Sequence, residues 1–159
     1  MKSQIHWHGL DPSLTLITIA SDEKTSLLSL QRVLDTIDQH ADTAALLLLS
    51  GVDYRTGQLL DIPRVTAHAQ SKGLVVGWDM AHAVGNTDLR LHDWNIDFAV
   101  WCCYKYLNCG PGAIAGVFVH ERHGRVEASS EGLLQFKPRL AGWWGADVRN
   151  RFKMESSKF

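Results

Sequence analysis

Two side chains in the middle of the sequence, Asp79 and Lys105, have the chemistry and the placement of a catalytic pair. Asp79 directly follows the hydrophobic run of residues 74–78, and Lys105 follows a second run at 98–103. Both runs are short, rich in β-branched or aromatic residues, and bounded by turn or polar residues, which is typical of buried strands. The carboxyl ends of parallel strands lie along one edge of an open sheet, where ligands bind. We therefore expect Asp79 and Lys105 to face a common cleft.

The two residue types suit an aldehyde cofactor with a basic ring. A lysine amine bonds to an aldehyde only when it is deprotonated, and partial burial favours that state. An aspartate at the carboxyl end of a strand can hold a protonated ring nitrogen, as pyridoxal phosphate requires of its protein. Each residue also has a plain structural interpretation: Lys105 as a surface lysine at a strand end, and Asp79 as the cap of residues 80–84.

Three further side chains could contact such a cofactor. His82 lies three residues after Asp79 and could sit beside it, although a lone histidine is more often structural. Ser50 and Tyr104 each place a hydroxyl at the expected edge of the sheet, where it could bind a phosphate. As a strand-end serine and a packed tyrosine, both also have ordinary structural roles.

Other kinds of site receive little support from the sequence. The cysteines and His92 lack the CxxC-type spacing of a zinc site, so we expect no metal. The run Gly110-Pro111-Gly112 matches neither a dinucleotide fingerprint nor a Walker loop.

The overall composition narrows the class of partner. A chain of 159 residues suits one domain, and its net charge of −1, without a run of Lys or Arg, gives no support to nucleic-acid binding. No apolar run approaches the roughly 20 residues of a membrane span, and the N-terminus lacks the apolar core of a signal peptide. An odd count of three cysteines, near one predicted strand, indicates reduced thiols. We expect a soluble, cytoplasmic protein without a membrane segment.

The order of predicted elements indicates an α/β domain. We predict strands at 14–20, 44–49, 74–78, 98–103 and 115–119. Helices are predicted at 26–39, capped by Thr25 or Ser26, and from Asp61 to about Ser71, ended by Gly73. Pro63 fits the first turn of the second helix, where a missing N–H costs nothing. Strands alternating with helices predict a layered α/β domain with mainly right-handed crossovers.

Several motifs, taken in order along the chain, resemble kynureninase. The resemblance begins near His8, covers essentially the rest of the chain and is strong because many motifs match with compatible spacing. The matching segments are Ser50-Gly51-Val52, Thr56-Gly57-Gln58, residues 79–86 (DMAHAVGN), residues 104–108 (YKYLN), Gly116, His120-Glu121, residues 142–145 (GWWG) and residues 151–154 (RFKM).

The resemblance implies a fold, a cofactor and a reaction. Kynureninase is a pyridoxal phosphate hydrolase of the aspartate aminotransferase fold (fold type I, three α/β/α layers) that works as a cytoplasmic homodimer. It cleaves L-kynurenine or 3-hydroxy-L-kynurenine to anthranilate or 3-hydroxyanthranilate plus L-alanine. This carbon–carbon bond hydrolysis belongs to tryptophan catabolism and leads towards NAD biosynthesis.

The resemblance also implies roles for individual residues. Lys105 matches the lysine that bonds the cofactor aldehyde and then moves protons, and Asp79 matches the partner of the ring nitrogen. His82, Tyr104 and Ser50 match cofactor-contacting positions, with Tyr104 near the phosphate and a candidate for proton transfer. Trp143 matches a tryptophan that reaches the cofactor phosphate of the partner subunit.

Family segments before and after the matched region have no counterpart here. We therefore expect residues 1–159 to form a partial large domain, truncated at both ends, without the N-terminal segment or the C-terminal small domain. Such a chain is expected to be inactive alone.

Two alternatives remain open: an inactive fragment or regulatory partner of a full-length subunit, and another fold type I enzyme such as a cysteine desulfurase or aminotransferase. The second is disfavoured because residues 82–86 and 104–108 look specific to kynureninase.

Overall fold

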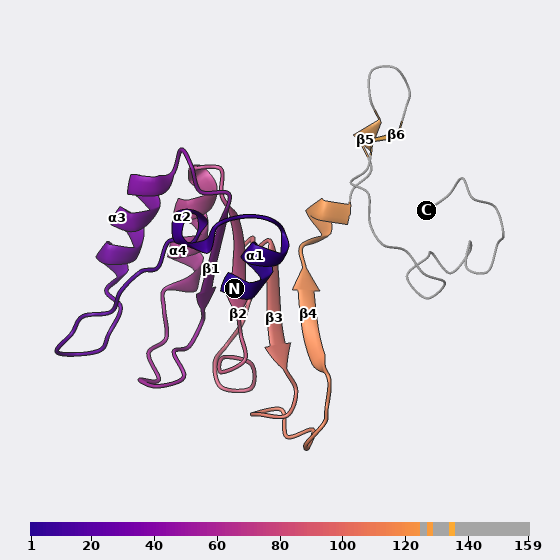
Figure 1. The fold of residues 1–159 in the computed structure, drawn as a ribbon. Coiled ribbons are helices and arrows are strands. Elements are labelled where there is room, and N and C mark those ends of the chain that lie inside the picture. The colour runs from indigo at the N-terminus through magenta and orange to yellow at the C-terminus, as the bar shows by residue number, and fades with distance from the viewer. Residues whose placement is uncertain (125–126, 129–133, 136–159) are drawn as a thin grey trace. The chain divides into compact units, whose positions relative to one another are not determined.

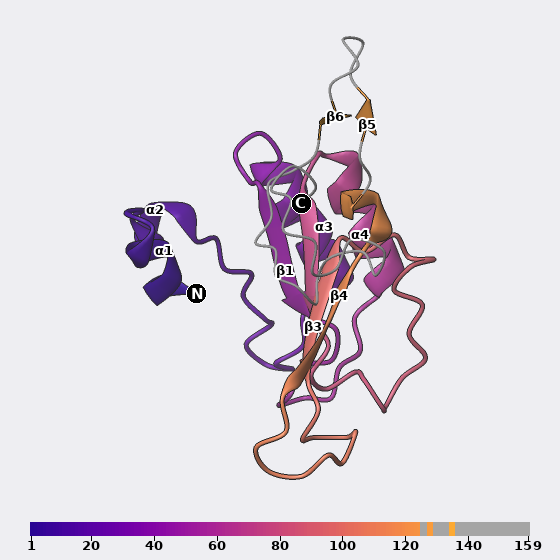
Figure 2. The same ribbon diagram turned by 90° about the vertical axis from the view of Figure 1, so that its right-hand side faces the viewer.

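The computed structural model describes residues 1–124, 127–128 and 134–135. The chain divides into two compact units, Met1–His120 and Glu121–Phe159. In the first unit a sheet has the order β1 (Leu46–Ser50), β2 (Val75–Asp79), β3 (Phe98–Cys102) and β4 (Ala115–Val119). Helices α3 (Leu30–His40) and α4 (Ile62–Ser71) lie beside each other next to this sheet (Figures 1 and 2). The described part of the second unit contains η1 (Glu121–Gly124) and the antiparallel pair β5 (Glu127–Ala128) and β6 (Leu134–Gln135).

The core forms where the amphipathic helices meet the sheet. Val33 of α3, Ile62 and Val65 of α4, and Val76 and Trp78 of β2 are at most 1% exposed. The indole Nε1 of Trp78 donates a buried hydrogen bond of 3.0 Å to Oγ1 of Thr66 on α4. Because a buried indole N–H needs a partner, this bond fixes α4 against β2, the strand that ends at Asp79.

Helix α4 begins and ends where the sequence predicts. The carboxylate of Asp61 caps the helix by accepting a bond from the backbone N–H of Arg64, and Pro63 occupies the first turn. Gly73 follows the helix with φ of +85°, the left-handed conformation that ends many helices.

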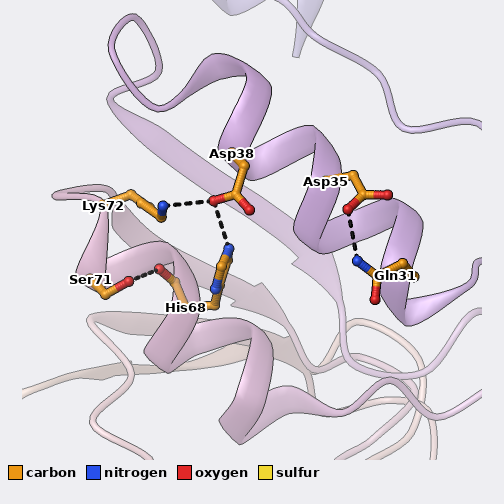
Figure 3. Close-up of polar contacts among 6 residues, drawn as sticks. All are labelled: Gln31, Asp35, Asp38, His68, Ser71 and Lys72. Atoms are coloured by element: carbon orange, nitrogen blue, oxygen red, sulfur yellow. Dashed lines mark hydrogen bonds and ion pairs between the residues drawn. The ribbon is translucent and has the colours of Figure 1, made fainter.

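Polar contacts on the surface tie α3 to α4. One carboxylate oxygen of Asp38 accepts bonds from Nε2 of His68 at 3.0 Å and from Nζ of Lys72 at 2.9 Å (Figure 3). The bond from Lys72 is the main reason that the pKa of Asp38 lies below its ordinary value, and the bond from His68 adds to it.

Helix α3 begins later than the sequence predicts. Its N-cap is Ser29, whose hydroxyl accepts from the N–H of Arg32, and neither Thr25 nor Ser26 caps it. Asp22 explains the difference, because its carboxylate binds the backbone N–H and hydroxyl of Thr25 and closes a turn. Ser26 therefore adopts φ of +59°, outside the helix.

The predicted strand at 14–20 is wrong. Asp11 caps a short helix, α2 (Pro12–Thr15), by accepting bonds from the backbone N–H and hydroxyl of Ser13. This helix follows α1 (Lys2–Trp7), and residues 16–20 have no regular secondary structure. The alternation of apolar residues with threonine was not sufficient to form a strand without a pairing partner.

The strand directions agree only partly with an all-parallel sheet. β1, β2 and β3 pair in parallel, whereas β4 runs antiparallel to β3. The segment between β3 and β4 contains no helix, and antiparallel neighbours are the pairs that a loop can join without a crossover. Along β4, Val117 and Val119 are 67% and 57% exposed, so the described residues leave one face of this strand open.

Candidate active site

Ser50 and Asp79 lie side by side at one edge of the sheet. They are the last residues of the parallel strands β1 and β2, and the strand register pairs them. The main chain continues this pairing, because the N–H of Gly51 donates to the carbonyl of Asp79 at 2.9 Å. Both side chains are exposed. The carboxyl ends of the strands therefore present a hydroxyl and a carboxylate to the same region.

Both interpretations of Asp79 describe part of its environment. Its Oδ1 accepts a 2.9 Å bond from the backbone N–H of Ala81 and so starts the turn that follows β2. Within the described residues its Oδ2 accepts no hydrogen bond. One oxygen thus holds the turn, while the other is available to a ligand.

The segment after β2, which we call the histidine turn (residues 80–87), carries His82. Met80 and Ala83 are fully buried and anchor the turn in the core. The loop after β1 packs closely on it, because a Cβ on Gly51 would lie 2.8 Å from Sδ of Met80. The turn is closed internally by bonds from the N–H groups of Ala83 and Val84 to the carbonyl of Met80. His82 is therefore presented by a well-packed segment.

Lys105 lies on a closed loop after β3, which we call the lysine loop (residues 103–109). The N–H of Cys109 donates to the carbonyl of Cys103 at 3.2 Å, and the N–H of Asn108 donates to the carbonyl of Lys105 at 3.0 Å. Asn108 adopts φ of +56°, a conformation that asparagine tolerates better than most residues. Lys105 itself is half-buried.

The lysine loop and the histidine turn meet at one hydrogen bond. Nζ of Lys105 lies 2.9 Å from Nε2 of His82, although the residues are 23 positions apart. On the other side of the ring, Nδ1 of His82 lies 3.3 Å from the hydroxyl of Tyr106. The Tyr106 ring meets the His82 ring edge-on, with 5.7 Å between centroids, and the Tyr54 ring lies 6.2 Å away. The sequence pattern indicated Tyr106 only as an aromatic neighbour of Lys105, and it gave Tyr54 no role at the site.

The remaining predicted residues lie near this pair without joining it. Tyr104 is 53% exposed, and its hydroxyl makes no hydrogen bond within the described residues. Trp143 lies outside the described residues. Ser50 lines a cavity of about 200 Å³, together with Ser21, Ser26, Arg55 and others, but Asp79, His82 and Lys105 do not line it.

The loop between β1 and α4 is organised by two side chains. Backbone N–H groups, above all that of Thr56, bind the carboxylate of Asp53 and lower its pKa. The amide of Gln58 then pairs with the backbone of Leu28, accepting from its N–H at 2.8 Å and donating to its carbonyl at 2.7 Å. The motif Thr56-Gly57-Gln58 thus has a structural role beside Ser50.

No group of three or more metal-ligating side chains occurs within the described part of the chain. Among the same residues, no helix is long and apolar enough to cross a membrane.

The fold and the site define a class of protein. Residues 3–130 match the model of the aminotransferase class-V family, and the chain belongs to this family. Structural similarity agrees: a cysteine desulfurase from Thermococcus onnurineus aligns with a TM-score of 0.61 over 86% of this chain and 35% of its own. At 20% identity this likeness supports the fold alone. The predicted α/β fold of type I is confirmed at this level.

The chain is similar to fungal kynureninases over nearly its whole length. It is 60% identical to kynureninase 1 of Neurospora crassa over 97% of this chain, and 56% identical to kynureninase 2 of Aspergillus clavatus over 99%. The chain spans about a third of the length of these relatives, 31% and 34% respectively. The predicted resemblance to kynureninase is therefore confirmed, and proteins of this kind depend on pyridoxal phosphate.

The described residues fit that cofactor. A half-buried amine at Lys105, a carboxylate oxygen without a hydrogen bond in this region at Asp79, and exposed side chains at Ser50 and Tyr104 supply the groups it requires. An amine can bond an aldehyde, a carboxylate can hold a ring N–H, and hydroxyls can donate to a phosphate.

Proposed function

We propose that this chain is part of a kynureninase that hydrolyses L-kynurenine or 3-hydroxy-L-kynurenine to anthranilate or 3-hydroxyanthranilate and L-alanine. The observation that carries the proposal is the 2.9 Å contact between Lys105 and His82, at the same end of the sheet as Asp79. Identity of 54–60% to several kynureninases supports the same reaction.

Four residues would hold pyridoxal phosphate. Lys105 would bond the cofactor's aldehyde, Asp79 would bind the cofactor's ring nitrogen, and Ser50 and Tyr104 would bind the cofactor's phosphate. When bound, this cofactor supplies an electron sink for charge that develops on the substrate's carbon atoms. Asp79 is held ready for its role, because the Ala81 N–H fixes the carboxylate through one oxygen and leaves the other for a ligand.

The proton chemistry falls to Lys105 and its neighbours. Lys105 can carry a proton on Nζ, and His82 lies close enough to exchange a proton or a hydrogen bond with it. Tyr104, on the same loop, offers a hydroxyl that is open to solvent and can take part in the same transfer.

We further propose a homodimer in the cytoplasm, in which Trp143 reaches the partner subunit's cofactor. Residues 1–159 would then be one part of the cofactor-binding large domain. The kynureninase similarity supports this assembly, and gel filtration with multi-angle light scattering would test it.

The residue assignment is tested by mapping where pyridoxal phosphate bonds to the chain. The chain is incubated with the cofactor, reduced with borohydride to make the lysine bond permanent, and digested for mass spectrometry. The label is expected on Lys105, and Lys105→Ala should remove it. Lys72→Ala is the matched control, because Lys72 is also hydrogen-bonded but lies at the end of α4. Label that persists in Lys105→Ala, or a chain that takes up no cofactor, would contradict the proposal.

A further inference from the structure

Tyr106 contacts the side of the His82 ring that faces away from Lys105, and the proposed function gives this contact no role. Its hydroxyl lies 3.3 Å from Nδ1 of His82, whose Nε2 lies 2.9 Å from Nζ of Lys105. We propose that Tyr106 is a positioning residue that orients His82 so that its Nε2 lone pair faces Lys105. This inference rests on the proposed function, since it gives Lys105 the role of cofactor lysine.

The backbone around Tyr106 is built to hold this contact. Gly85 of the histidine turn has φ of +82°, and a Cβ there would lie 3.1 Å from the carbonyl oxygen and 3.2 Å from Cβ of Tyr106. The amide of Asn86 donates to the carbonyl of His82 at 2.9 Å. The histidine turn and the lysine loop therefore pack closely enough that a side chain at position 85 would crowd Tyr106.

The two ring nitrogens of His82 are coupled through their partners. An N–H of Lys105 that donates to Nε2 leaves the amine lone pair free to bond the cofactor aldehyde, so the proposal requires Nε2 to accept and the ring hydrogen to reside on Nδ1. In the proposed arrangement the Tyr106 hydroxyl, which can accept as well as donate, accepts from Nδ1–H. The bond from Nδ1–H to Tyr106 thus favours the tautomer whose Nε2 can accept from Lys105, as in other oriented histidines.

Few other polar groups face this histidine. Tyr54 packs near the ring but its hydroxyl makes no hydrogen bond within the described residues. Asp79, which directly precedes the histidine turn, accepts a bond at Oδ1 from the backbone N–H of Ala81. Lys105 and Tyr106 are therefore the side chains that hydrogen-bond the His82 ring among the residues described.

The first test reads the His82 ring without any cofactor. ¹⁵N-labelled histidine in the 159-residue chain reports the tautomer by NMR, with His82 assigned from a His82→Gln spectrum. The wild-type chain is expected to show the Nδ1–H tautomer. Tyr106→Phe keeps the ring and removes the hydroxyl, so it should lower the ratio of Nδ1–H to Nε2–H roughly two- to twelve-fold, the worth of one neutral hydrogen bond. Tyr54→Phe removes a neighbouring hydroxyl without such a bond and should leave the ratio unchanged.

The second test measures how fast Lys105 bonds to pyridoxal phosphate at fixed pH. Tyr106→Phe should slow this reaction by a similar roughly two- to twelve-fold factor, and Tyr54→Phe should not. An unchanged or increased ratio of Nδ1–H to Nε2–H in Tyr106→Phe overturns the positioning role, whatever the cofactor does, and so does a wild-type chain with the Nε2–H tautomer. A shifted ratio in a chain that takes up no cofactor supports the orientation of His82 and rejects the proposed function instead.

Discussion

The buried bond between Trp78 and Thr66 provides the sharpest test of how the core supports the site. Both side chains are 0% exposed, and the bond joins α4 to the strand that ends at Asp79. Thr66→Val keeps the branched shape but removes the acceptor, leaving the indole N–H of Trp78 buried without a partner. That desolvation costs about 1–3 kcal/mol of unfolding free energy. For a chain of this size the melting temperature should fall by about 2–12 °C.

The assay is urea unfolding followed by far-ultraviolet circular dichroism, because the substitution alters the surroundings of a fluorescent tryptophan. We expect a lower midpoint with an unchanged slope, which indicates lost stability rather than a changed unfolded state. Thr66→Ser is the matched control, since it keeps the hydroxyl and loses one methyl group, at a cost of roughly 0.5–1.5 kcal/mol.

A double-mutant cycle separates the hydrogen bond from other effects of the substitution. In a Trp78→Phe background the indole N–H is absent, so Thr66→Val should cost little there. If Thr66→Val destabilised both backgrounds equally, the bond would not be the cause, and the reasoning about α4 and β2 would be refuted.

Two further substitutions test the surface and the site. Asp38→Asn removes the charge that accepts the hydrogen bond from Lys72. The pKa of Asp38 is lower in the folded chain than the ordinary value of about 3.9. The Asp38 carboxylate therefore stabilises the folded chain fully above about pH 3.9, and this stabilisation disappears as the pH falls through the lower folded pKa. Urea midpoints of wild type and Asp38→Asn should therefore differ at pH 7 and converge in acid. Asp35→Asn is the matched control, because it removes a carboxylate of the same helix that is bonded to the neutral amide of Gln31. Gly85→Ala should cost more unfolding free energy than Gly73→Ala. Both glycines have a left-handed backbone, which costs an alanine about 1–2 kcal/mol at either position. Only at Gly85 would the new Cβ also contact the lysine loop. Equal losses for the two alanines would show that the close approach of the two segments contributes nothing.

The sequence predicted the elements whose signals are local and mutually consistent. Helix α4 carries its cap, its proline and its terminal glycine in the expected order, so each short-range preference supports the same answer. The strands β1, β2 and β3 are short apolar runs, and their length and composition were sufficient to identify them as strands. Their predicted burial is only partial, because Leu46, Val75 and Val100 are exposed.

The failures arose where a nearby side chain competed for the backbone. Asp11 and Asp22 each bind N–H groups two or three residues ahead, which formed a short helix in one case and delayed α3 in the other. Such bonds depend on side-chain geometry that apolar periodicity does not record. The direction of β4 likewise depends on the path of the connecting loop, which hydrophobicity alone does not specify.

The candidate site shows the same division between what a strand end fixes and what a loop fixes. The register of β1 and β2 is enough to bring Ser50 beside Asp79, and the two apolar runs that end at these residues could predict that neighbourhood. The contact of Lys105 with His82 joins two loops, and it depends on the close packing of Gly85 against Tyr106 as well as on the sheet. Tyr106 is adjacent to Lys105 in sequence, so it would belong to the opposite side if the strand alternation continued through this segment. Because the chain leaves the strand at Cys102 and turns within the lysine loop, both residues instead reach the same imidazole ring, one at each nitrogen. A strand-based interpretation therefore identifies the lysine and the aspartate, whereas the geometry that orients them is set by the turns that follow the strands.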